Sequence, residues 1–113
     1  MFVKKLLLSF IFIFNISVMA EPLDPVKLLS EFVGVDTINP PGNESRAVEF
    51  YAKIFEEEGI EYFTGESALG RGNIWARIKG GDQPALILLQ HTDVVPASKD
   101  YWETDPMIAE IKD

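Results

Sequence analysis

The sequence predicts an α/β layer fold, and three observations carry this prediction. Apolar residues recur at helical spacing in residues 24–34 and again in residues 43–59. The pattern then changes to the alternation of strands in residues 60–63 and 73–80. A continuous aliphatic run follows in residues 85–90, with the length of a strand that is covered on both faces. Helices followed by strands indicate an α/β domain.

The first helix is predicted to begin after Asp24. Aspartate is a good N-cap, and Pro25 suits the first helical position because its missing N–H has no helical partner to lose. Gly34 is expected to end the helix. One face carries apolar residues at helical spacing: Val26, Leu29 and Val33.

The segment DTINPPGNE, residues 36–44, is predicted to be a loop because two prolines and a glycine interrupt any regular element. Asn43 is the expected N-cap of the second helix, and Gly59 is its expected end. The apolar face of this helix comprises Ala47, Tyr51, Ile54 and Phe55.

The second half of the chain is predicted to form strands. In residues 73–80, Ile74, Ala76 and Ile78 share one face. Glycines and an aspartate then turn the chain, and residues 85–90, ALILLQ, are expected to form a buried strand. The closing MIAEIKD gives a weaker strand pattern.

The composition limits the kinds of partner and metal ligand that the chain can have. A chain of 113 residues, 47% hydrophobic and 25% charged, is ordinary for one small globular domain. The formal net charge of −8 argues against nucleic acid or anionic lipid as a partner, because such binding needs clustered lysine and arginine. The chain has no cysteine, which excludes disulfides and leaves only histidine, carboxylates, carbonyls and water as metal ligands.

Residues 1–20 have the pattern of an export signal. Lys4 and Lys5 precede an apolar core in residues 6–14, and Val18 and Ala20 occupy the positions before a cleavage site. Cleavage after Ala20 would deliver a secreted or periplasmic chain with no membrane attachment. The alternative is an uncleaved anchor, but the apolar stretch is shorter than the roughly 20 residues of a spanning helix.

His91 is the chain's single histidine, and it stands where the aliphatic run ends, two positions before Asp93. In open α/β sheets, sites form where strands end. Residues i and i+2 of an extended segment share a face, so Asp93 can orient the imidazole for metal binding. Taken alone, the pair is a weak signal, because a single surface histidine is more often a polar residue at the end of a strand than a metal ligand.

Three segments together resemble one known family. The segment ALILLQHTDVVPASKDYWETDPM resembles the first signature of the zinc-dependent exopeptidases and deacylases. This family includes aminoacylases, acetylornithine deacetylases, succinyl-diaminopimelate desuccinylases and glutamate carboxypeptidases. The upstream segments INPPGNE and GRGNIWARIKG resemble its preceding loop and strand. The match covers residues 24–113, in order.

The resemblance implies a fold, a site and a reaction. The fold would be the N-terminal part of a catalytic domain whose helices pack on a mixed, mainly parallel sheet. The position of His91 ligates one of two Zn²⁺ ions in that family, and the position of Asp93 supports the site from behind the ligand. A metal-activated water hydrolyses small peptides or N-acyl amino acids. The family is often homodimeric through a further domain.

The chain departs from the family pattern at its end. The family's remaining metal ligands and its general base have no counterpart before Asp113. We therefore expect residues 21–113 to be an incomplete catalytic domain that is inactive alone. The alternative function is a small acidic exported binding or interaction domain without catalysis. The sequence leaves the substrate specificity open.

Overall fold

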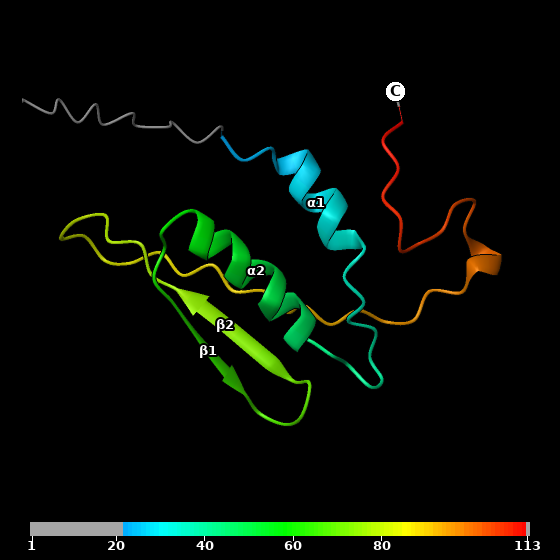
Figure 1. Ribbon diagram of the computed structural model, residues 1–113, viewed down its shortest axis with the longest axis horizontal. Helices are drawn as coiled ribbons and strands as arrows, with labels where there is room; N and C mark the ends of the chain where they lie inside the picture. The colour runs from blue at the N-terminus through cyan, green and yellow to red at the C-terminus, as the bar shows by residue number, and fades with distance from the viewer. Residues whose placement is uncertain (1–21, 113) are drawn as a thin grey trace, which may run out of the picture.

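The computed structural model describes residues 22–112, so the predicted export signal lies outside the described residues. Two helices precede a two-stranded hairpin, and a long irregular segment follows it (Figure 1). The elements are α1 (Pro25–Val33), α2 (Ser45–Glu57), β1 (Tyr62–Glu66), β2 (Gly72–Ala76) and a short 3₁₀ helix, η1 (Lys99–Tyr101).

The predicted start and end of α1 are confirmed. The side chain of Asp24 accepts a hydrogen bond of 2.9 Å from the backbone N–H of Val26, which satisfies one of the free donors of the first turn. Pro25 occupies the first turn. The N–H of Gly34 closes the helix by donating to the carbonyl of Glu31.

The predicted N-cap of α2 is wrong by one residue. Glu44 takes the cap position without a side-chain hydrogen bond, and Asn43 lies in the left-handed region with φ 76°. Asparagine tolerates this conformation better than most residues, so Asn43 serves the turn into α2 instead. Gly59, with φ 65°, follows the end of the helix as predicted.

The strands β1 and β2 pair antiparallel, with Tyr62 opposite Ala76 and Glu66 opposite Gly72. The hairpin packs on the start of α2, and Gly72 permits the close approach: a Cβ there would lie 2.9 Å from the Cα of Ser45. The strands occupy somewhat different residues from those predicted. The expected mainly parallel sheet is not formed by residues 22–112, where the only parallel pairing is the bridge between Ile38 and Val94.

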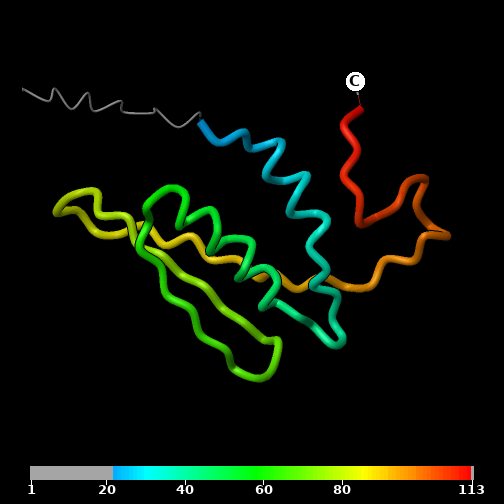
Figure 2. Tube along the Cα trace, in the orientation of Figure 1, coloured from blue at the N-terminus to red at the C-terminus, as the bar shows by residue number. Residues whose placement is uncertain are grey.

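The predicted buried strand at residues 85–90 is also wrong. This segment is irregular and does not join the sheet (Figure 2), and Gln90 at its end donates a hydrogen bond of 3.3 Å to the hydroxyl of Tyr51 in α2. A strand needs a neighbouring backbone to pair with, and no part of residues 22–112 supplies one. Residues 86–89 consequently expose 82–93% of their surface. The weaker strand predicted at the C-terminal end is irregular as well.

The two helices are joined by a small aromatic cluster. The ring of Phe32 lies 5.3 Å from that of Phe50 and 5.0 Å from that of Tyr51, measured between centroids. Such tilted pairs add to the burial of apolar surface. No helix in the described part of the chain is long and apolar enough to cross a bilayer.

We expect the chain to self-associate through the aliphatic run. Burying one Leu or Ile side chain is worth about 2 kcal/mol, and four such residues are exposed side by side. The double substitution Ile87→Lys and Leu89→Lys should shift the chain to a smaller species in size-exclusion chromatography with light scattering. Leu69→Lys is the matched control, because Leu69 is equally exposed but stands alone in the hairpin turn. A monomeric wild-type chain would contradict this expectation.

Candidate functional site

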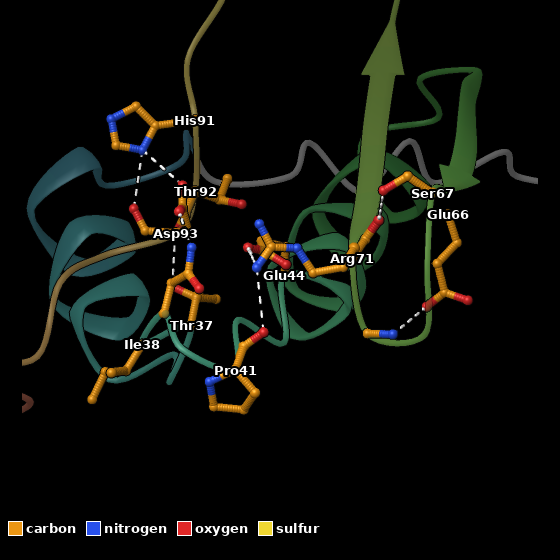
Figure 3. A network of polar contacts seen from close by, with 12 residues as sticks. Thr37, Ile38, Pro41, Glu44, Glu66, Ser67, Arg71, His91, Thr92 and Asp93 are labelled. Atoms are coloured by element: carbon orange, nitrogen blue, oxygen red, sulfur yellow. Dashed lines mark hydrogen bonds and ion pairs between the residues drawn. The ribbon is translucent and has the colours of Figure 1, made fainter.

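The imidazole of His91 is oriented by the residue two positions along. Its Nδ1 lies 3.0 Å from the backbone oxygen of Asp93 and 3.1 Å from Oδ1 of the same residue (Figure 3). A backbone oxygen and an ionised carboxylate oxygen can only accept hydrogen bonds. Nδ1 must therefore carry the proton, which it shares between these two oxygens. In the neutral ring, the lone pair is then on Nε2. The side chain is 86% exposed, which leaves Nε2 accessible.

The carboxylate of Asp93 is held from its other side. Asn39 donates a hydrogen bond of 2.9 Å from Nδ2 to Oδ2 of Asp93. This bond is the largest cause that lowers the pKa of Asp93 below its ordinary value, and the contact with His91 lowers it further. Asp93 therefore stays ionised as a hydrogen-bond acceptor for the imidazole.

Asn39 was not identified from the sequence, although its loop belongs to the resemblance. Its position follows from a backbone pairing of residues 37–39 with residues 92–94. The N–H of Asn39 donates to the oxygen of Val94 at 2.8 Å, and the N–H of Val94 donates to the oxygen of Thr37 at 3.2 Å. The buried Thr37 hydroxyl also donates to the oxygen of Thr92 at 2.6 Å. The only sequence signal for Asn39 is a polar residue directly before two prolines.

The described residues contain one candidate metal ligand, His91. His91 presents one accessible nitrogen with an ionised carboxylate behind it, which is the arrangement of a metal-binding histidine. No group of three or more histidine, aspartate or glutamate side chains converges within residues 22–112. The arrangement can therefore supply one ligand to a metal ion, with its orientation fixed in advance.

Comparison with known proteins finds similarity to succinyl-diaminopimelate desuccinylases and to a metallohydrolase. It is 31% identical over 99 residues to the succinyl-diaminopimelate desuccinylase of Parvibaculum lavamentivorans, and 35% identical over 90 residues to that of Herminiimonas arsenicoxydans. These matches cover 83% and 76% of the chain. The chain is homologous to the succinyl-diaminopimelate desuccinylases. An uncharacterized metallohydrolase of Methanococcus maripaludis is 28% identical over 80% of the chain.

The match to the desuccinylases has a defined extent. The chain spans about a quarter of the length of the curated relatives it matches, 24% and 22% for the two desuccinylases. No family model and no solved structure matches it. The resemblance that the sequence predicted is thus confirmed, and the names of the homologues favour a metallohydrolase or deacylase over the alternative of a non-catalytic binding domain.

Replacing Asn39 with alanine should raise the pKa of Asp93. The substitution removes the hydrogen bond that contributes most to the lowered pKa, while the contact with His91 remains. Because the folded pKa is depressed, the stability gained from this bond is present above the ordinary pKa of aspartate and disappears as pH falls through the lowered value. An NMR titration of the Asp93 carboxyl carbon measures both values.

The matched control for this titration is Asn73→Ala, which removes an exposed asparagine from β2, far along the chain from Asp93. The pKa of Asp93 should be the same in this variant as in the wild type. An Asn39→Ala chain that titrates like the wild type would show that another group holds the carboxylate.

Proposed function

We propose that this chain is part of a metal-dependent hydrolase of N-acyl amide or peptide bonds, with zinc as the metal and His91 as one of its ligands. The observation that carries the proposal is the hydrogen bonding of the His91 ring. With the proton held on Nδ1 by Asp93, the free lone pair is on the accessible Nε2. Homology to desuccinylases and to a metallohydrolase gives the reaction class.

The side chains fit a zinc ligand in three respects. Zinc takes the neutral imidazole nitrogen, and His91 offers that nitrogen on an exposed side chain. Histidine ligands commonly donate their other N–H to a carboxylate or a carbonyl, and Nδ1 of His91 has both acceptors in Asp93. The lowered pKa of Asp93 keeps that acceptor charged over the working range of a hydrolase.

These contacts support a catalytic role for each of the two side chains. A zinc ion bound at the site would polarise the amide carbonyl and lower the pKa of water. His91 would hold the metal, and Asp93 would keep the ring in the binding tautomer, as a supporting group behind the ligand. Zinc takes three or four protein ligands in all. We propose that the remaining ligands and the general base correspond to the part of the desuccinylases that this chain does not match.

The substrate class follows from the same homology. The relatives are named for removing a succinyl group from diaminopimelate, so we propose N-acylated amino acids, including N-succinyl compounds, as the substrates. The export pattern in residues 1–20 supports a periplasmic or secreted location.

A chimeric enzyme tests the proposal. The 90-residue segment of the Herminiimonas desuccinylase that matches this chain would be replaced by the corresponding residues of this chain. The chimera should bind zinc and hydrolyse succinyl-diaminopimelate. His91→Ala should abolish hydrolysis, because a metal ligand is lost. Asp93→Asn should lower kcat/KM by roughly 10- to 100-fold, because the orienting carboxylate is lost.

The matched control is Asp82→Asn, which removes one carboxylate from an exposed turn before the aliphatic run and should leave kcat/KM unchanged. Zinc content is measured on the same preparations. An active chimera whose His91→Ala variant keeps both its zinc and its turnover would refute the assignment of His91.

A further inference from the structure

We propose that Arg71 is a positioning residue for the His91–Asp93 pair, acting at a distance through the turn that carries Asn39. The proposal rests on the proposed function of His91 as a metal ligand. Arg71 is the last residue of the hairpin turn, directly before β2, and lies apart from His91 and Asp93 (Figure 3). Arg71 contacts the turn at residues 41–44, this turn places Asn39, and Asn39 holds the carboxylate of Asp93 beside the imidazole.

The first step is that the two carboxylate oxygens of Asp93 have different hydrogen-bond partners. Oδ1 faces Nδ1 of His91 at 3.1 Å, and Oδ2 accepts the hydrogen bond of Asn39 at 2.9 Å. The terminal torsion of an aspartate is soft, so a carboxylate with one partner rotates easily. Asn39 therefore fixes the rotation that directs Oδ1 at the imidazole.

The second step is the turn that places Asn39. The backbone reverses directly after it, and the N–H of Gly42 donates to the oxygen of Ile38 at 2.9 Å. Gly42 and Asn43 both have positive φ angles, 111° and 76°. Glycine and asparagine tolerate these conformations, which lets the chain turn sharply between Asn39 and α2.

The third step is the guanidinium that fills the turn. Nη1 of Arg71 donates to the oxygen of Pro41 at 3.3 Å and lies 3.1 Å from Oε1 of Glu44. A Cβ on Gly42 would lie only 2.3 Å from this Nη1, so the guanidinium occupies the space that a side chain would take. Arg71 thus contacts both ends of the segment between Pro41 and Glu44.

Burial makes this contact hard to replace. Glu44 is only 7% exposed, and neither of its carboxylate oxygens has a hydrogen bond within the described part of the chain. The contact with Arg71 is therefore an ion pair without hydrogen-bond geometry. A buried carboxylate that loses its cation is strongly disfavoured, so Glu44 holds Arg71 in the turn. The backbone of Arg71 is held by the hairpin turn, where the backbone N–H of Arg71 donates to the oxygen of Ala68 at 2.8 Å.

The tautomer of the His91 ring tests the proposal without any metal. Because the chain has one histidine, ¹⁵N-histidine labelling gives a single set of ring signals. The measurement is made on the full chain, below the concentration of self-association and at alkaline pH, where an imidazole is neutral. In the wild type, Nδ1 should carry the proton. In the double variant Arg71→Ala/Glu44→Gln, which leaves no unpaired buried charge, the ratio of the two tautomers should shift by roughly 10-fold toward protonated Nε2.

Two further variants keep the result interpretable. Asn39→Ala should shift the ratio in the same direction, because it removes the last link to Asp93. Arg77→Ala removes an exposed arginine directly after β2, at the other end of the hairpin from Arg71, and should leave the ratio unchanged. Circular dichroism checks that each variant is folded. If the double variant does not fold, Arg71→Lys replaces it, since lysine keeps a cation beside Glu44 but lacks the planar guanidinium. A folded Arg71 variant with the wild-type ratio overturns the proposal.

The same substitutions in the chimeric desuccinylase separate this proposal from the proposed function. Arg71→Lys should lower kcat/KM there by roughly 10-fold, as expected for the loss of a group that orients a ligand. If His91→Ala leaves the chimera active, the metal role of His91 fails, while the tautomer measurement still decides whether Arg71 positions the ring.

Discussion

The structure depends on the parallel pairing between residues 37–39 and residues 92–94. Four hydrogen bonds join these segments, which lie more than 50 residues apart in the sequence, and the side-chain bond from Asn39 to Asp93 is one of them. One segment leads into α2, and the other carries His91 and Asp93. Without the pairing, Asn39 would not reach Asp93, and the carboxylate of Asp93 would lose the partner on its second oxygen. The site therefore exists only where the helical part of the chain and the segment after the aliphatic run meet.

Features with local causes were predictable from the sequence. The start of α1 depends on Asp24 and Pro25, which act within one turn of the helix. The relation between His91 and Asp93 is local as well, because two positions in an extended segment bring an imidazole within reach of a carboxylate. The sequence therefore predicted the helices and the orienting pair, together with the reason for the pair.

Features that need a distant partner were not predictable in the same way. The run at residues 85–90 has the composition of a buried strand, but composition does not supply the neighbouring backbone that a strand requires. Asn39 and Arg71 are further examples, since the partners of both side chains lie far away in the sequence. Asn43 illustrates a local signal with two meanings, because asparagine favours both helix caps and left-handed turns.

The two carboxylates of the site region, Glu44 and Asp93, lie in different surroundings, and the difference matches the roles proposed for them. Glu44 is buried against Arg71, where desolvation makes the loss of either partner unfavourable and thereby fixes the turn. Asp93 is partly exposed, and each of its oxygens has a separate partner, so its charge is stabilised by hydrogen bonds instead of by a buried cation. An ionised acceptor with no cation of its own is what a metal-binding imidazole needs behind it. Placing Arg71 beside Glu44, and Asn39 beside Asp93, gives the turn its rigidity while the positive charge stays away from the nitrogen that would bind a metal.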